Sequence, residues 1–212
     1  MPRSTPGTAR PARTSLSTPM RVLVACEFSG IVRDAFRKLG HDAWSCDLLP
    51  CEADPQWHIQ GDVMPLLGQG WDLMIAHPPC TDLAVSGARW FKKKGLPRIL
   101  EAADFFKQML WAPIPKICLE NPVSVASRLV QKPTQEIHPW QFGHEAEKTT
   151  WLWLVGLPAL KPTKIVDKGE QITFASGRKM SKWYYERWGD GHTLSVTFPG
   201  IANAMAEQWG SL

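Results

Sequence analysis

The sequence has no hydrophobic run long enough to cross a membrane, because no apolar stretch approaches the roughly 18 residues that a spanning helix needs. Residues 1–19 lack the apolar segment of a secretory signal and are rich in serine, threonine, proline and arginine. We therefore expect a disordered tail over residues 1–19, a single folded domain over residues 20–212, and a cytoplasmic protein without a membrane partner.

The cysteines show no Cys-x-x-Cys spacing, so we predict no zinc site and no bound metal. The chain has five: Cys26, Cys46, Cys51, Cys80 and Cys118. An odd number of cysteines without a secretory signal fits a reducing compartment.

The net positive charge of the body of the chain is small. The net charge is +4, but Arg3, Arg10 and Arg13 lie in a tail without acidic residues, which leaves +1 for the rest. Nucleic-acid binding would therefore depend on local patches. Two basic clusters interleaved with aromatic residues are candidates: Arg89, Lys92, Lys93 and Lys94 in one, and Arg178, Lys179 and Lys182 in the other. The alternative for each is a solvated charge run.

A nucleotide-binding pattern opens the folded part. Residues 21–26 form an apolar strand, Phe28-Ser29-Gly30 a glycine turn, and residues 31–39 a helix, followed by a strand over 42–46 that ends at Asp47. The glycine lets the backbone approach a ligand, and Asp47 could accept hydrogen bonds from ribose hydroxyls. Either a cofactor site or plain strand–helix packing explains this unit. Asp62, in the following turn, could reach an adenine amino group or could simply stabilise the turn.

A second stretch concentrates candidate chemistry. Residues 72–76 read as a buried strand that Pro78 and Pro79 end, so Cys80 is held on a stiff turn past the strand's carboxyl end. Ligands bind at that edge of open α/β sheets. The alternative is a buried structural cysteine.

The next two elements are a helix and a strand. A helix over residues 97–111 should bury Ile99, Leu100, Ala103, Phe106, Met109 and Leu110. A strand over residues 114–119 then delivers Glu120 and Asn121 to the edge where Cys80 lies. A carboxylate at the end of an apolar strand is costly without a partner, which favours a functional role.

The order of these motifs resembles that of the DNA cytosine-5-methyltransferases, and small phage-type members most closely. Phe28-Ser29-Gly30 is similar to the family's Phe-x-Gly-x-Gly loop, Pro78-Pro79-Cys80 to its Pro-Cys-Gln loop, and Glu120-Asn121 to its Glu-Asn-Val triplet. Phe142-Gly143 with Lys148 resembles its arginine motif, and Gly200 to Ala204 its closing helix.

The resemblance implies an α/β fold with a Rossmann-like sheet, helices on both faces, and S-adenosyl-L-methionine as cofactor. It also implies DNA as partner and the cytoplasm of a bacterial or phage-infected cell. The implied catalytic residues are Cys80, Glu120, Asn121 and Lys148. The implied cofactor-binding residues are Phe28, Ser29, Gly30, Asp47, Asp62, Pro78 and Asn203.

The implied chemistry explains these residue types. A Cys80 thiolate adds to carbon 6 of cytosine and makes carbon 5 nucleophilic. A protonated Glu120 engages ring N3, Asn121 holds the loop or the base edge, and Lys148 steadies charge at O2. The base must leave the duplex to reach such a pocket.

This chain departs from the family in its short recognition region, near residues 157–198. Two further hypotheses therefore stand beside DNA methylation. The same chemistry could act on a free cytosine nucleotide or single-stranded nucleic acid, or the chain could be a non-catalytic DNA-binding protein on a methyltransferase scaffold.

Overall fold

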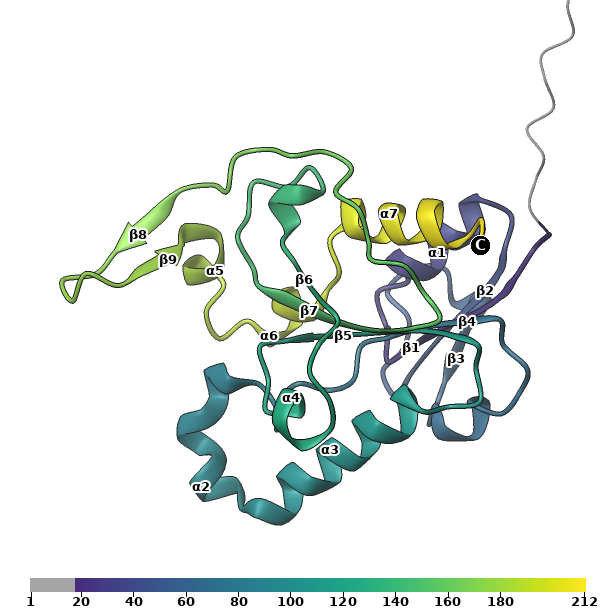
Figure 1. Ribbon diagram of the computed structural model, residues 1–212, viewed down its shortest axis with the longest axis horizontal. Helices are drawn as coiled ribbons and strands as arrows, with labels where there is room; N and C mark the ends of the chain where they lie inside the picture. Colours follow the sequence, from purple (N-terminus) through teal and green to yellow (C-terminus); the bar gives the residue numbers. More distant parts are fainter. Residues whose placement is uncertain (1–17) are drawn as a thin grey trace, which may run out of the picture.

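The computed structural model describes residues 18–212, with the backbone alone described at residues 89–92. Its centre is a seven-stranded sheet in the order β3-β2-β1-β4-β5-β7-β6 (Figure 1). Strands β1 to β5 are parallel, and β7 runs antiparallel to both β5 and β6. The predicted Rossmann-like α/β fold is confirmed. The disordered tail predicted for residues 1–19 lies, apart from residues 18 and 19, outside the described residues.

The strands of the main sheet are β1 Arg21–Ala25, β2 Asp42–Asp47, β3 His58–Gln60, β4 Leu73–Ala76, β5 Lys116–Pro122, β6 Gln135–Ile137 and β7 Thr150–Val155. A separate hairpin pairs β8 Gln171–Thr173 with β9 Lys179–Ser181. The α-helices are α1 Ile31–Lys38, α2 Phe91–Lys94, α3 Leu96–Leu110, α4 Ala126–Leu129, α5 Lys182–Glu186, α6 Gly191–Ser195 and α7 Pro199–Trp209. Short 3-10 turns are η1 Pro55–Trp57, η2 Met64–Leu66, η3 Val85–Trp90 and η4 Pro139–Gln141.

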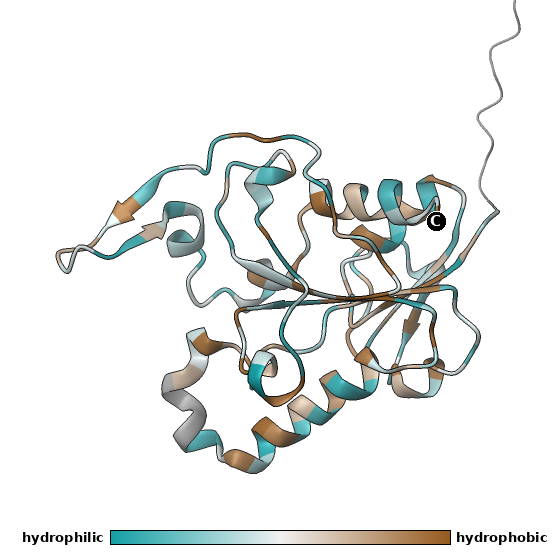
Figure 2. Ribbon diagram, viewed as in Figure 1, coloured by the Kyte–Doolittle hydropathy of each residue, from teal (hydrophilic) through white to brown (hydrophobic). Residues whose placement is uncertain are grey.

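Alternation along β1 explains why both faces of the sheet are covered. Val22 and Val24 point into a core that α1 and α7 close, whereas Leu23 and Ala25 point into a second core beneath α3. In Figure 1, α1 and α7 lie on one side of the sheet and α3 and α4 on the other. Hydrophobic residues concentrate along the central strands in Figure 2. The sheet is therefore buried on both faces, as the near-continuous apolar strands predict.

Three regions differ from the sequence-based predictions. Strands β3 and β6 lie in two stretches for which no strand was predicted. Leu100 is 49% exposed although it was assigned to the core stripe of α3. Residue 100 follows Ile99 by about 100° around the helix, and that turn carries it out of the buried face.

Residues 157–198 hold the β8–β9 hairpin together with α5 and α6, and the hairpin projects away from the main sheet (Figure 1). We call the β8–β9 hairpin and α5 the arm. Of the helices in the described part of the chain, none is long and apolar enough to cross a membrane.

Candidate active site

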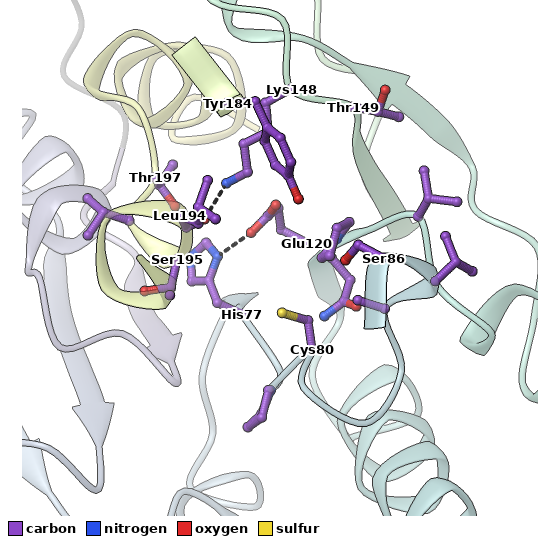
Figure 3. Close-up of a pocket in the computed structure, with 18 of the residues that line it drawn as sticks. His77, Cys80, Ser86, Glu120, Lys148, Thr149, Tyr184, Leu194, Ser195 and Thr197 are labelled. Carbon is purple, nitrogen blue, oxygen red and sulfur yellow. Dashed lines mark hydrogen bonds and ion pairs between the residues drawn. The ribbon is translucent and has the colours of Figure 1, made fainter. Parts of the chain in front are cut away.

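A cavity of about 850 Å³ opens at the carboxyl ends of the parallel strands. It is lined by segments that follow β1, β4 and β5, by residues 147–149, and by the arm and α6. The segment after β1 contributes Phe28 and Ser29, and the other segments contribute Cys80, Glu120 and Lys148. Figure 3 shows the Cys80 sulfur, the Glu120 carboxyl group and the Lys148 ammonium group directed into the same space. Residues expected from separate motifs therefore meet in one site.

Cys80 lies on a closed turn after β4. Its carbonyl oxygen accepts hydrogen bonds from the N–H groups of Leu83 at 3.0 Å and Ala84 at 2.7 Å. Burial and the negative charge of Glu120 raise the pKa of Cys80, and the positive charge of Lys148 only partly offsets them. The sulfur is therefore a protonated thiol at neutral pH in the free protein.

Glu120 extends from β5 into the cavity with a side chain that is 12% exposed. Its Oε2 lies 3.0 Å from Nδ1 of His77, the residue that follows β4. Burial alone would raise the pKa of Glu120, but the hydrogen bond with His77 and the charge of Lys148 lower it below its usual value. The free protein thus pairs a thiol with a carboxylate, the reverse of the thiolate and carboxylic acid that the resemblance implies.

Asn121 connects β5, which carries Glu120, to the turn that carries Cys80. Its Nδ2 donates a 2.8 Å hydrogen bond to the carbonyl oxygen of Pro78, and the side chain is buried. This contact fits the predicted role of holding the loop. Oδ1 of Asn121 has no hydrogen-bond partner within residues 18–212, and the residue lines the cavity. A polar edge of a ligand could satisfy that oxygen.

Lys148 faces the cavity but already has a partner. Its Nζ donates a 2.7 Å hydrogen bond to the carbonyl oxygen of Leu194 in α6. The same ammonium group lowers the pKa values of both Cys80 and Glu120, so it lies close to both in electrostatic terms. Lys148 therefore connects α6, through its hydrogen bond, to the part of the cavity that holds Cys80 and Glu120.

The loop after β1 forms the other end of the cavity. Cys26 and Glu27 line it beside Phe28 and Ser29, and Cys26 adopts the left-handed backbone conformation with φ 56°. Such conformations cost energy in residues with a side chain and gather at functional sites. Glu27 is buried and its carboxylate accepts hydrogen bonds from the N–H groups of Val32 at 2.7 Å and Arg33 at 3.3 Å. These two bonds fix the loop to the start of α1.

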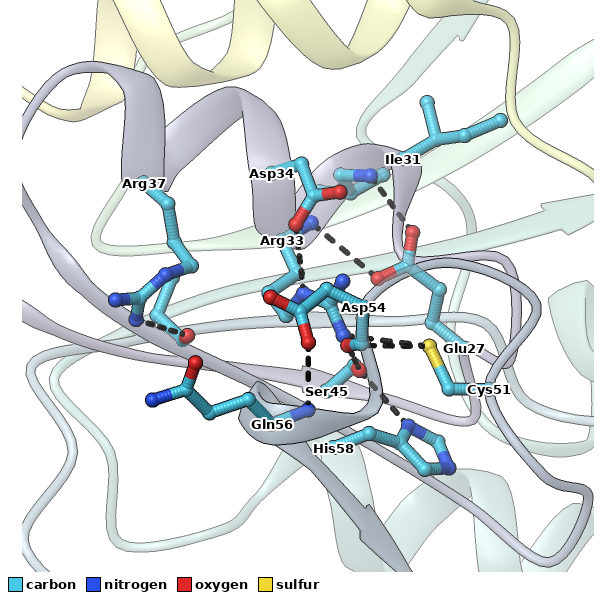
Figure 4. A network of polar contacts seen from close by, with 12 residues as sticks. Glu27, Ile31, Arg33, Asp34, Arg37, Ser45, Cys51, Asp54, Gln56 and His58 are labelled. Carbon is cyan, nitrogen blue, oxygen red and sulfur yellow. Dashed lines mark hydrogen bonds and ion pairs between the residues drawn. The ribbon is translucent and has the colours of Figure 1, made fainter.

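Gly30 lies next to the cavity residues Phe28 and Ser29 but does not itself line the cavity, and its cofactor role stays a prediction. Its φ of 75° suits glycine, and a Cβ there would lie 2.7 Å from Nη2 of Arg33 and 3.0 Å from Ala53. Arg33 is fully buried under the loop, where Nη1 donates to Ser45 at 3.2 Å (Figure 4). The glycine is therefore needed for the close packing of Arg33.

The other predicted cofactor residues fall into two groups. Asp47 accepts a hydrogen bond from the N–H of Leu49 at 2.9 Å, and Asp62 from that of Met64 at 3.0 Å. Neither aspartate lines the cavity, but burial, followed by charges that include both, raises the pKa of Cys26, which does line it, to about 12. Asn203 lies on the exposed face of α7 and outside the cavity. Pro78 lines the cavity as predicted.

The predicted nucleic-acid patches divide in the same way. Arg178 and Lys179 line the cavity from the arm, whereas Lys182 lies outside it and pairs with Glu170. Lys94 pairs with Asp82 at 2.8 Å, beside the Cys80 turn. Lys93 is exposed, and the side chains of Arg89 and Lys92 lie outside the described residues.

Sequence reasoning missed several cavity residues, among them His77, Tyr184 and Trp188. His77 carried a usable signal, because it stands directly between a buried strand and the two prolines. Tyr184 and Trp188 follow the second basic cluster in the sequence, but they were not predicted to line the cavity. Nothing local in the sequence indicates that the arm closes over the site.

No protein family model matches the sequence, and no curated protein matches it. Among solved structures, the chain is similar to a "putative DNA modification methyltransferase encoded within prophage" from E. coli, with a TM-score of 0.45 and 13% sequence identity. The alignment covers 70% of this chain and 52% of that one, so this chain spans about half the length of its neighbour. The strand order of this chain's sheet and the positions of its own side chains define the cavity and its lining.

Proposed function

We propose that this protein is an S-adenosylmethionine-dependent methyltransferase that methylates carbon 5 of cytosine in DNA through a covalent adduct with Cys80. The observation that carries the proposal is the convergence of Cys80 and Glu120 on one cavity. They follow β4 and come from β5, two neighbouring parallel strands, although forty positions separate them in the sequence. A thiol and a carboxyl group on one cavity are the two groups that this reaction needs.

The residues present fit the cofactor. A cavity of about 850 Å³ lies within the range of small-molecule sites, roughly 300–1,000 Å³, and its two ends have different chemistry. The end near Phe28 and Ser29 offers an aromatic face and a hydroxyl group, and the charges of Asp47 and Asp62 act on Cys26 in its wall. S-adenosylmethionine, when bound there, supplies an electrophilic methyl group. The acidic surroundings favour its positive charge.

The chain's own residues account for the remaining steps. The Cys80 sulfur loses its proton and bonds to carbon 6, the electron pair of the carbon 5–carbon 6 double bond shifts towards carbon 4, and N3 gains a proton through Glu120. Carbon 5, now nucleophilic, takes the methyl group. The carbon 5 proton then passes to water, its electron pair re-forms the carbon 5–carbon 6 double bond, and the sulfur–carbon 6 bond breaks to release Cys80. Asn121 keeps the Cys80 turn in place through Pro78.

One observation favours a second substrate class with the same chemistry. The region that would read a DNA sequence is confined to residues 157–198, which include the exposed side chains of Tyr185 and Trp188. Exposed aromatic rings stack on unpaired bases without reading a sequence. Single-stranded nucleic acid or a free cytosine nucleotide is therefore the alternative substrate.

A transfer assay separates these possibilities. The protein is incubated with tritiated S-adenosylmethionine and duplex DNA, single-stranded DNA, RNA or dCMP, in parallel with Cys80→Ala. Label in duplex DNA that disappears in Cys80→Ala supports the main proposal, and label confined to unpaired substrates or dCMP supports the alternative. Absence of label together with retained DNA binding would indicate a non-catalytic DNA-binding protein.

Glu120→Gln gives a second test with a matched control. We expect the chemical step to fall by about 100-fold or more, the usual contribution of a general acid. Glu136→Gln is the control, because Glu136 also pairs with a histidine, His138 at 3.2 Å, but lies outside the cavity. Equal rates in the two variants would remove Glu120 from the mechanism.

A further inference from the structure

His77 occupies a fixed position between the strand ends. Its N–H donates a 2.9 Å hydrogen bond to the carbonyl oxygen of Ala25 at the end of β1, and its side chain is only 9% exposed. Nδ1 lies 3.0 Å from Oε2 of Glu120, and Nε2 is buried with no hydrogen-bond partner within the described part of the chain. Donation from Nδ1 to Glu120 leaves Nε2 as a bare acceptor. That tautomer avoids a buried, unpaired N–H.

The groups that face His77 come from three segments. Glu120 lies on β5, and Glu27, from the loop after β1, is close enough to interact electrostatically with His77, although burial raises the pKa of the Glu27 carboxyl group overall. Lys148, which precedes β7, faces Glu120 from the other side, and Cys80 follows two residues after Pro78. Figure 3 shows His77 beside Glu120, with Cys80 nearby and Lys148 opposite.

The proposed reaction needs a proton to change place. The sulfur must lose its proton when it bonds to carbon 6, and N3 must gain one. The free protein holds one proton for the two groups, on Cys80 rather than on Glu120. No proton has to enter or leave the site if the thiol proton itself reaches N3.

Resting on the proposed function, we propose that His77 is a positioning residue: by its hydrogen bond to Oε2, it turns Oε1 of Glu120 to the bound pyrimidine, where that oxygen carries the thiol proton of Cys80 to N3. His77 keeps its own proton throughout.

The step is balanced in atoms and charge. The S–H bond of Cys80 breaks as the sulfur–carbon 6 bond forms, the proton passes to Oε1 of Glu120, and Oε1 passes it to N3. The electron pair of the carbon 5–carbon 6 double bond becomes the carbon 4–carbon 5 bond, and the former carbon 4–N3 pair takes the proton. After methyl transfer, the carbon 5 proton passes to water, its electron pair re-forms the carbon 5–carbon 6 double bond as the sulfur leaves, and N3 returns its proton to the sulfur through Glu120.

A double-mutant cycle tests this role. His77→Leu removes the donor, whereas His77→Asn keeps an N–H group near the position of Nδ1. In single-turnover methylation we expect His77→Leu to lower the rate about 10- to 100-fold, as the loss of one hydrogen bond to a charged group does, with KM changed less than about threefold. His77→Asn should recover most of that loss. In a Glu120→Gln background, His77→Leu should have almost no further effect, because His77 acts through Glu120.

The pH profile supplies a readout that a purely structural role would not move. Loss of the His77 hydrogen bond raises the pKa of Glu120, so the acid limb of the rate profile should move to higher pH in His77→Leu. His138→Asn is the control, since His138 also pairs with a glutamate but lies outside the cavity.

The outcomes are distinct. A wild-type protein that transfers no methyl group overturns the proposed function and this role together. An active wild type with a His77→Leu rate within twofold, additive losses in the double variant, or an unmoved acid limb overturns the role of His77 alone.

Discussion

The side chain of Asn121 donates a 2.8 Å hydrogen bond to the carbonyl oxygen of Pro78, and this bond joins the strand that carries Glu120 to the turn that carries Cys80. Two backbone hydrogen bonds reinforce the connection, from Val85 to Val123 at 2.9 Å and from Val125 to Leu83 at 2.8 Å. The relative position of the two reactive groups is therefore set by local contacts between the segments that follow β4 and β5.

Asn121→Ala removes the side-chain link and leaves the Pro78 carbonyl oxygen without this donor. We expect a loss of about 1–3 kcal/mol in the free energy of unfolding, the usual cost of an unsatisfied buried group, measured by urea denaturation. Methyl transfer should fall further than stability explains, because the Cys80 turn loses its anchor. Asn203→Ala, on the exposed face of α7, should change neither quantity. Equal effects in the two variants would contradict the account.

The raised pKa of Cys80 predicts slow alkylation at neutral pH. The rate of iodoacetamide labelling, followed by peptide mass spectrometry, should rise with a midpoint above that of a free cysteine, about 8.5. Lys148→Met removes a charge that lowers the pKa, so the midpoint should rise further. Glu120→Gln removes a charge that raises it, so the midpoint should fall. A midpoint below about 8.5, or one that neither variant moves, would show that groups other than Lys148 and Glu120 determine the pKa of the Cys80 thiol.

Alanine substitutions at Gly30 and Gly40 distinguish the energetic cost of backbone strain from that of steric crowding. Both have positive φ, 75° and 88°, but a Cβ at Gly30 would crowd Arg33, whereas one at Gly40 meets nothing within 4 Å. Gly40→Ala should cost about 1–2 kcal/mol from the left-handed backbone alone. Gly30→Ala should cost clearly more, because buried Arg33 has to move. Urea denaturation of both variants measures the difference, and equal costs would contradict the packing role of Gly30.

The arm offers a test of the nucleic-acid surface. Arg178→Gln combined with Lys179→Gln should weaken DNA binding and make the dependence of affinity on salt less steep, since each lost phosphate contact lowers that slope by about one. Lys182→Gln is the control, because Lys182 pairs with Glu170 outside the cavity. Fluorescence anisotropy at several salt concentrations gives both quantities. If Lys182→Gln weakens DNA binding as much as the double variant does, Arg178 and Lys179 make no specific contribution to DNA binding.

The sequence allowed the parallel sheet to be predicted because its central strands are nearly continuous apolar runs that end in recognisable turns. Cys80 and Glu120 could be brought together for the same reason, since the carboxyl ends of parallel strands meet at one edge. Asn203 was assigned by resemblance to a motif, and the helix face on which it lies depends on how α7 packs against α1. The partner of Glu120 could not be predicted, because the pairing of His77 with it depends on the register of β4 against β5.

The short elements were missed for a different reason. Strand β3 and the strands of the arm have three residues each, too few for an alternating pattern to emerge. Gly30 was expected to face a ligand because a glycine turn before a helix often does so. Only the structure reveals that the Arg33 side chain fills the space next to Gly30.

Covalent trapping measures the central claim most directly. A duplex that contains 5-fluorocytosine is incubated with the protein and S-adenosylmethionine, because fluorine at carbon 5 blocks the final elimination and leaves the sulfur bonded to carbon 6. The account predicts a stable protein–DNA adduct that maps to the peptide containing Cys80 and is absent in Cys80→Ala. An active protein that forms no adduct, or one that forms it through another residue, would contradict it.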